Sequence, residues 1–252
     1  MFLLPTTNPI LIAAAVIPAM ILLNYIYKKD RLEKESRKLL ISLVVMGIVS
    51  TALAVVAERI GSFVLELVLT EGSLLYNALL YFGVVACAEE GAKYILLKRK
   101  TWSSPEFNCQ FDGVVYAVFV SLGFALWENI GYVAAYGLPT ALVRAVTAVP
   151  GHACFGVFMG AWYGMAKRYE NSGEAEKSRQ CRKLAFWVPA LIHGTYDFIA
   201  TLNATLSALV FVAFVLFLFF SAMARVRKIS AEDEYISDHD NNDGDNIGPI
   251  FF

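Results

Sequence analysis

The sequence predicts an all-α fold, a polytopic bundle of seven transmembrane helices, with eight as the alternative if the short segment 61–69 pairs with another piece of chain. Three observations lead to this prediction. Hydrophobic residues make up 58% of the 252 residues and charged residues only 17%, against roughly 25% charged residues in average soluble domains. Several apolar stretches reach the ~20 residues that a helix needs to cross a bilayer. Basic residues gather in alternate loops.

Apolar stretches justify the spans one by one. In order, they cover residues 9–27, 39–57, 73–97, 114–136, 138–166, 184–202 and 206–224. The fifth stretch is long and contains Pro150-Gly151, and a proline removes a backbone donor and clashes with the preceding turn, so we expect a kink or a break there. Segment 61–69 is too short to span, and we place it at the outer interface.

The distribution of positive charge orients the bundle. Of 21 Lys and Arg residues, 18 fall in loops that lie on one side of a seven-span map. The positive-inside rule then places the N-terminus outside and the C-terminus in the cytosol. We divide the chain into a transmembrane helical domain at 1–228 and an acidic tail at 229–252, whose composition predicts a disordered cytosolic segment.

Composition also excludes some classes of protein. The formal net charge of −1 gives no indication of nucleic-acid binding. The four cysteines show no CxxC or other metal-ligand spacing, so we expect free thiols and no disulfides. Cys87 and Cys154 share helices with polar residues, and we interpret both as packing residues.

A few polar groups remain inside the predicted spans, although a charge at the bilayer centre costs about 2.5–3.5 kcal/mol on insertion scales. Pairs four residues apart place Glu89 with Lys93, and His193 with Asp197, on shared helix faces. We therefore expect four helices to aim polar side chains into one hydrated cavity near the middle of the membrane. The groups are Glu89, Glu90, Lys93, Glu128, Arg144, His152, His193 and Asp197.

Paired carboxylates beside histidines can perform general acid–base chemistry. One carboxylate would take a proton from water, and histidine or asparagine donors would stabilise the oxyanion formed at a carbonyl. Peptide hydrolysis inside a membrane fits these groups, but proton-coupled transport uses similar buried chains. Arg144 lies nearer the outer end of its span, and we interpret it as structural or as a counter-ion.

Four ordered motifs resemble those of the PrsW-type intramembrane proteases, within the larger group of CAAX prenyl endoproteases and bacteriocin-immunity-type membrane proteins. The motifs are EEGAK at 89–93, FALWEN at 124–129, HACFG at 152–156 and HGTYD at 193–197. The resemblance covers about residues 10–225. It implies a glutamate-dependent endopeptidase in a prokaryotic plasma membrane, which makes the first cut in a single-pass membrane protein such as an anti-sigma factor during regulated, signalling proteolysis.

The resemblance also implies roles for the motif residues. Glu89 is the expected base that activates water, with Glu90 sharing the proton and Lys93 tuning the pair; the choice between the two glutamates is near even. The other expected roles are a proton shuttle (Glu128), an oxyanion donor (Asn129), water orientation or oxyanion stabilisation (His152 and His193), a fixed tautomer of His193 (Asp197) and structural support (Phe124 and Gly156).

Three other readings stay open. Two His and two Glu could bind Zn²⁺, but no HExxH motif is present, and we expect no cofactor. A proton-coupled transporter or channel would use the same groups. A scaffold without activity would bind a partner helix through the face formed by Gly156 and Gly160. Substrate identity and oligomeric state do not follow from the sequence.

Overall fold

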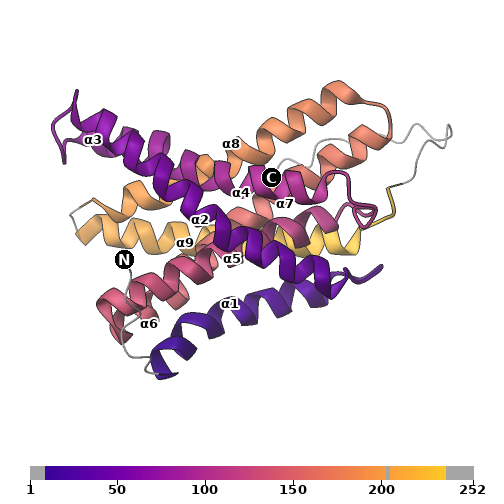
Figure 1. Ribbon diagram of the computed structural model, residues 1–252, viewed down its shortest axis with the longest axis horizontal. Coiled ribbons are helices and arrows are strands. Elements are labelled where there is room, and N and C mark those ends of the chain that lie inside the picture. Colours follow the sequence, from indigo (N-terminus) through magenta and orange to yellow (C-terminus); the bar gives the residue numbers. More distant parts are fainter. Residues whose placement is uncertain (1–8, 203–204, 237–252) are drawn as a thin grey trace.

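A computed structural model describes residues 9–202 and 205–236 of the chain. Every regular element among these residues is a helix (Figure 1), which confirms the all-α prediction for the described part. Residues 237–252, most of the predicted disordered tail, lie outside the described residues. The elements are α1 (Pro9–Lys29), α2 (Arg37–Glu66), α3 (Leu74–Ala78), the π-helical η1 (Leu79–Val85), α4 (Ala86–Thr101), α5 (Asp112–Tyr136), α6 (Leu138–Val146), α7 (Ala148–Asn171), α8 (Ala175–Ala200) and α9 (Thr205–Ala231).

Within the described residues, five helical stretches have the length and apolar composition to cross a membrane. They are α1, α2, α5, α6 with α7, and residues 207–231 of α9. The predicted spans 73–97 and 184–202 are helical as well. The first is made of the successive elements α3, η1 and α4, none of which reaches 18 residues, and both spans carry ionisable groups of the motifs. The bundle is therefore that of a multi-pass membrane protein with at least two unusually polar helices.

Several helix boundaries differ from the prediction, and three of these differences affect the interpretation. Helix α2 continues to Glu66, so most of segment 61–69 extends this helix and does not form a separate interfacial piece. The break in the fifth stretch falls at Thr147, because Pro150 lies in the first turn of α7, where proline costs no intrahelical hydrogen bond. Helix α8 begins at Ala175, nine residues before the predicted start, with an amphipathic first half.

Helix α5 forms the centre of the bundle and packs against α1, α2, α4 and α7. In Figure 1, α1 lies along the lower edge and α8 along the upper edge, with α5 and α7 between them. Glycines allow the closest contacts: a Cβ at Gly47 would lie 2.1 Å from the carbonyl oxygen of Val120, and one at Gly160 would lie 2.4 Å from that of Gly113. Such backbone contact holds α2 and α7 tightly on α5.

The helix that carries the first motif is continuous from α3 through α4, with the π-helical η1 in its middle. π-Helical turns are rare and occur frequently at functional sites. The thiol of Cys87 donates to the carbonyl oxygen of Phe82 at 3.2 Å, which satisfies one of the carbonyls in this turn. Glu89 and Glu90 follow the end of η1 by four and five residues.

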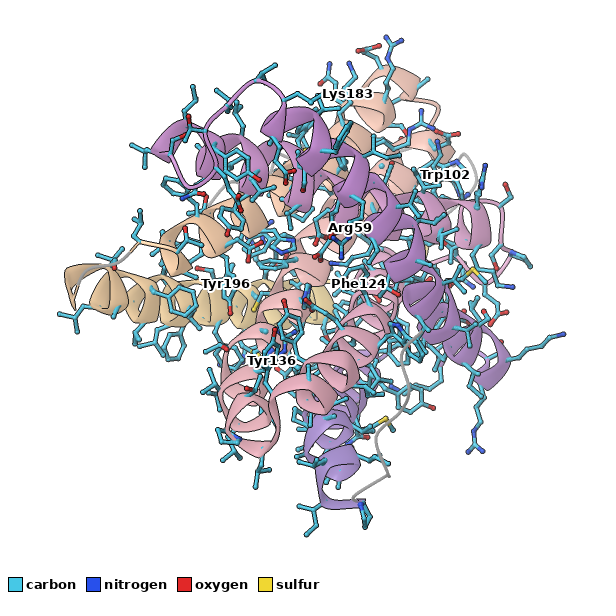
Figure 2. The ribbon with its side chains drawn as sticks, turned by 60° about the vertical axis from the view of Figure 1, so that its left-hand side comes forward. Arg59, Trp102, Phe124, Tyr136, Lys183 and Tyr196 are labelled. Carbon is cyan, nitrogen blue, oxygen red and sulfur yellow. The ribbon has the colours of Figure 1, made fainter. Side chains whose placement is uncertain are left out.

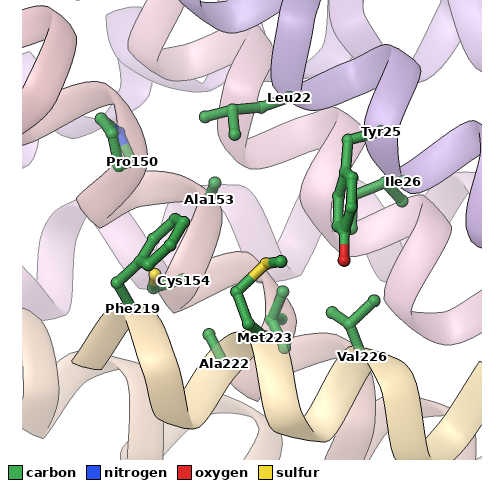
Figure 3. Close-up of a pocket in the computed structure, with 11 residues that line it drawn as sticks. Leu22, Tyr25, Ile26, Pro150, Ala153, Cys154, Phe219, Ala222, Met223 and Val226 are labelled. Atoms are coloured by element: carbon green, nitrogen blue, oxygen red, sulfur yellow. The ribbon is translucent and has the colours of Figure 1, made fainter. Parts of the chain in front are cut away.

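An apolar crevice lies between α1, α7 and α9, on the side of α7 away from the motif residues (Figure 3). Cys154 lines it beside Pro150, Ala153 and Phe219. Cys154 is buried there, and all four cysteines of the chain are free thiols, as predicted.

Candidate active site

Lys93 lies at the centre of the cluster that the motifs form. Its ammonium donates to Oε1 of Glu90 at 2.7 Å and to Oε2 of Glu89 at 3.3 Å, both on the same helix. It also lies 3.1 Å from Nδ1 of His152 on α7, and 4.0 Å from the centre of the Phe124 ring on α5. Lys93 is fully buried, and its ammonium contacts the two glutamates, the imidazole and the ring.

His152 connects Lys93 to Glu128. Because an ammonium can only donate, Nδ1 of His152 accepts from Lys93 and the ring carries its proton on Nε2. That Nε2 lies 2.9 Å from Oε2 of Glu128, to which it donates. The same oxygen of Glu128 accepts from the guanidinium of Arg144 at 2.8 Å. The chain Lys93–His152–Glu128–Arg144 therefore joins four helices, α4, α7, α5 and α6.

His193 on α8 completes the cluster from the opposite side. Its Nδ1 lies 3.0 Å from Oε1 of Glu90, and its Nε2 lies 3.3 Å from Oδ2 of Asp197 and 4.0 Å from Oε2 of Glu89. Both ring nitrogens face carboxylates, which only accept, so the doubly protonated ring satisfies both contacts. Phe155 stacks on this imidazole with the ring centres 4.6 Å apart, which fixes its plane.

The cluster is more open at one side than at the other. The side chains of Glu90 and Lys93 are fully buried, whereas those of Glu128 and Asp197 are 24% and 23% exposed. Glu89 lies between these limits, with 9% of its side chain exposed. A substrate would therefore meet Glu89, Glu128 and Asp197 before the deeper groups.

The supporting residues bring the helices together. Gly156 faces Val118 and Ser121 on α5, where a Cβ would come within 2.9 Å of Val118 Cα. Phe124 covers Lys93 and lies 5.5 Å from the His152 ring, centre to centre. In Figure 2, Phe124 lies near the middle of the view, Lys183 at the top and Trp102 at the upper right. The side chains of the four motifs lie together in the described structure, and the hydrated cavity and the catalytic roles assigned to them stay predictions.

Asn129 has different contacts from those expected of an oxyanion donor. Its Nδ2 donates to the carbonyl oxygen of Ala15 on α1 at 2.9 Å, and its Oδ1 accepts from Nε of Arg144 at 3.0 Å. The amide therefore ties α1 and α6 to α5. Its contacts favour the positioning of Arg144 over direct contact with a substrate.

Two further charged residues lie near the cluster. Arg144, interpreted from the sequence as structural or as a counter-ion, pairs with Glu128, and its guanidinium also lies 4.0 Å from the centre of the Tyr132 ring. Glu58 was placed outside the second predicted span, but α2 continues past it and brings it into electrostatic range of Glu128, Lys93 and His193. The sequence feature that could have indicated this position is that Glu58 directly follows an apolar stretch, which can continue as the same helix.

The residues present can be tested for a metal ion. Within the described residues, Glu89, Glu90 and His152 are the set that offers three ligand atoms within 4.8 Å of one another, and such donors suit zinc. However, the Lys93 ammonium lies within 3.3 Å of all three residues, at the position that a metal ion would need. As they are arranged, these groups do not fit a metal ion beside Lys93.

Comparison with known proteins agrees with the motifs. The family model described as "PrsW family intramembrane metalloprotease" matches residues 35–224. The chain is 33% identical to Protease PrsW of Oceanobacillus iheyensis over 218 residues, 86% of this chain and 95% of that protein. It is 34% identical to Protease PrsW of Bacillus subtilis over 192 residues, 76% of this chain and 83% of that one. For Protease PrsW of Geobacillus kaustophilus the identity is 35%, over 75% of this chain and 79% of the relative. No solved structure matches the chain significantly.

Proposed function

The chain belongs to the PrsW family of intramembrane proteases and is a peptidase, and from this premise we propose that it cleaves a membrane-anchored protein by glutamate-activated water, without a metal ion. The observation that carries the proposal is the position of Lys93. Its ammonium supplies the positive charge that balances Glu89 and Glu90 and the hydrogen-bond donor that Nδ1 of His152 accepts from. Because the lysine and not a metal ion balances the charge, no carboxylate has to serve as a metal ligand, and one of them can exchange a proton with water.

Glu89 is the proposed base. Glu90 is held by two short contacts, from Lys93 and from His193, whereas the nearest contacts of Glu89 are 3.3 and 4.0 Å long. Glu89 is also the more exposed of the two. In the proposed reaction Glu89 takes a proton from water, the water oxygen attacks the carbonyl carbon of the scissile bond, and the proton then passes to the amine nitrogen as the C–N bond breaks.

The histidines have separate roles in this scheme. His193 presents Nε2 at the more open side, beside Asp197, and donates to the oxyanion as it forms. His152 connects Lys93 to Glu128 through its two ring nitrogens. Glu128, which pairs with Arg144, is the proposed group that accepts a proton transferred through this imidazole. Asn129 positions Arg144.

The arrangement in the membrane and the substrate class are part of the proposal. All seven predicted spans, with the N-terminus outside and the C-terminus in the cytosol of a prokaryotic cell, place 18 of 21 basic residues on the cytosolic side. The substrate is a single-pass membrane protein, such as an anti-sigma factor whose cleavage transmits a signal.

A second candidate is a zinc-dependent protease, which the ligand spacing of Glu89, Glu90 and His152 favours. Zinc would act as a Lewis acid on the carbonyl and activate water. This candidate requires Lys93 to move away from its three partners, and therefore predicts that Lys93 is dispensable. The metal-free mechanism predicts the opposite.

The proposal can be tested by cleavage of a membrane-anchored substrate library with the purified protein in detergent. Glu89→Gln and His193→Ala should each lose more than ~10²-fold in rate, the scale expected when an acid–base group is removed. Glu174→Gln, at an exposed glutamate that pairs with Lys177, is the matched control and should cleave like wild type. Equal cleavage by all variants would refute the assignment, and proton leak from liposomes without cleavage would support a transporter.

A further inference from the structure

A second group of acidic side chains lies far from the motifs, where four segments of the chain meet. Asp30 follows α1, Glu35 precedes α2, Asp112 is the first residue of α5 and Asp233 follows α9. We refer to these four residues as the acidic junction. The first three are 3%, 5% and 0% exposed, and Asp233 is half-buried.

One carboxylate oxygen of each residue in the acidic junction is buried and has no hydrogen-bond partner. These oxygens are Oδ2 of Asp30, Oε2 of Glu35, Oδ1 of Asp112 and Oδ2 of Asp233, and they make up four of the seven unpartnered buried side-chain atoms among the described residues. A buried carboxylate oxygen that lacks a partner costs free energy. So many in one place indicate a ligand that all four can share.

In Glu35, Asp112 and Asp233 the other carboxylate oxygen has an ordinary partner. The Tyr116 hydroxyl donates to Oε1 of Glu35 at 2.8 Å. Backbone N–H groups of the loop before α5 donate to the rest: Asn108 and Cys109 to Oδ2 of Asp112 at 3.0 and 2.7 Å, and Phe111 to Oδ1 of Asp233 at 2.9 Å. These bonds hold the carboxyl groups of Glu35, Asp112 and Asp233 in place, and Asp30 is buried, with 3% of its surface exposed.

Positive charge is scarce around the acidic junction. Within the described residues, Lys34 is the cation that acts on Asp30, and its ammonium donates to the backbone carbonyls of Tyr27 and Asp30. No Lys or Arg of the described residues forms an ion pair with any of the four carboxylates. Instead the acidic groups act on one another: Glu35 lies within hydrogen-bonding reach of Asp112, and Asp30 interacts with Asp233.

We propose that the acidic junction binds a hydrated Mg²⁺ ion. Mg²⁺ is held by one or two carboxylates and keeps several of its waters. At Mg–O distances of 2.0–2.1 Å, neighbouring ligand oxygens lie about 2.9 Å apart, so two adjacent carboxylates can bind one ion. Glu35 and Asp112 are the direct ligands, and Asp30 and Asp233 accept hydrogen bonds from the waters on the ion.

The spacing of the carboxylates favours this ion over one that needs more protein ligands. Among the described residues, only Glu89, Glu90 and His152 of the active-site cluster offer three ligand atoms within 4.8 Å of one another. The acidic junction therefore offers fewer than three direct protein ligands to one ion. Ca²⁺ takes six to eight oxygen ligands, and a site of that kind would need more convergent carboxylates. A proton shared by Glu35 and Asp112 is the alternative without an ion, but it would leave the unpartnered oxygens of Asp30 and Asp233 as they are.

The ion would join the C-terminal segment to the helix that carries Glu128. Residues 232–236 already contact the loop before α5: Ile236 N donates to the carbonyl oxygen of Asn108 at 2.6 Å, and Cys109 and Tyr235 form an isolated β-bridge. Ser230 adds a hydrogen bond from its hydroxyl to the carbonyl oxygen of Lys29. Binding of Mg²⁺ would lock this segment onto the start of α5.

Calorimetric and thermal titration of the full-length protein with MgCl₂ tests the proposal. After chelator treatment at pH 7.5, millimolar Mg²⁺ should raise the melting temperature and bind once per chain. Asp30→Asn, which removes a carboxylate without breaking any side-chain hydrogen bond of the structure, should weaken binding by 10–100-fold, the usual range for a group that supports a metal ligand. Asp112→Asn should abolish binding.

Two controls separate this site from the active site. Glu90→Gln should bind Mg²⁺ like wild type, because Glu90 lies in the other cluster. Glu174→Gln should do the same, because Glu174 is an exposed carboxylate elsewhere on the molecule. No Mg²⁺ binding by wild type, or binding that Asp30→Asn and Asp112→Asn leave unchanged, would overturn the proposal, and so would Mg²⁺ binding that Glu90→Gln abolishes.

Discussion

The active-site cluster and the acidic junction both bury carboxylates, but they balance the negative charge in different ways. The cluster contains its own cations: Lys93 lies against Glu89 and Glu90, and Arg144 lies against Glu128. The acidic junction has no ion-pair partner of this kind among the described residues, and it holds four unpartnered buried oxygens, whereas the cluster holds one, Oε2 of Glu90. The difference indicates that the first region is organised for chemistry without a ligand, whereas the second is complete only when a cation binds.

The largest effect is expected when Lys93, the buried cation of the active-site cluster, is removed. Lys93→Met would leave two buried carboxylates without their counter-ion, and loss of one partner from a buried ion pair costs about 3–5 kcal/mol. We expect cleavage to fall by more than ~10²-fold and the free energy of unfolding to drop by that amount, measured by denaturant titration in detergent. Lys177→Met, at a lysine that is 58% exposed, is the control. Retained cleavage by Lys93→Met would contradict the account.

A smaller effect is expected at the other cation of the cluster. Arg144 and Glu128 are both partly exposed, and Arg144 positions Glu128 without contacting Lys93. Arg144→Gln should lower kcat by roughly 10-fold with little change in KM, as for loss of an interaction made in the transition state. Arg144→Lys should recover only part of the rate, since an ammonium cannot contact Glu128 and Asn129 through two parallel donors. An unchanged kcat in both variants would make Arg144 an interfacial anchor only.

The smallest expected effect is a pH dependence of stability that comes from the acidic junction. Burial raises the pKa of Asp30 to about 6 and that of Glu35 to about 7. The groups that act on these two carboxyls are Lys34, Asp233 and Glu33 for Asp30, and Tyr116, Asp112, Glu106 and Asp30 for Glu35. Because the folded state holds these protons up to a higher pH than the unfolded chain, stability should fall as pH rises from about 4.5 to about 7 in Mg²⁺-free buffer.

The predicted fall of stability with rising pH can be checked by melting curves between pH 4.5 and 8, with and without Mg²⁺. Mg²⁺ should reduce the loss of stability at pH 7 and above, because it binds the ionised carboxylates. Glu35→Gln should flatten the curve in Mg²⁺-free buffer. A melting temperature that rises steadily from pH 4.5 to 7 in Mg²⁺-free buffer would show that these carboxyls are paired in another way.

The sequence predicts the active-site cluster better than the acidic junction for a physical reason. Glu89 with Lys93, and His193 with Asp197, repeat at helical spacing within apolar stretches, where any charge is conspicuous. The residues of the acidic junction lie in loops and at helix ends, where acidic residues are ordinary, and up to about 200 positions separate them in the chain. Only the packing of α1, α2, α5 and α9 brings them together.

Helix boundaries account for the other differences. Hydropathy placed the end of the second span before Glu58, but α2 continues to Glu66, and Gly61 in this extension lies against Val84 of η1. The break at Thr147, in place of Pro150, creates the short helix α6 that carries Arg144 to Glu128. Neither the position of Glu58 near the cluster nor the Arg144–Glu128 pair follows from the spacing of residues along one helix, because each depends on how different helices pack.

The most direct test of the central claim is the cleavage rate of purified wild-type protein after zinc is removed. A zinc-selective chelator is used in buffer with excess Mg²⁺, so that the acidic junction stays saturated, and the zinc content per chain is measured in the same sample. We predict well under one zinc ion per chain and an unchanged cleavage rate. One zinc ion per chain, with cleavage lost on chelation and restored by added zinc, would contradict the role assigned to Lys93.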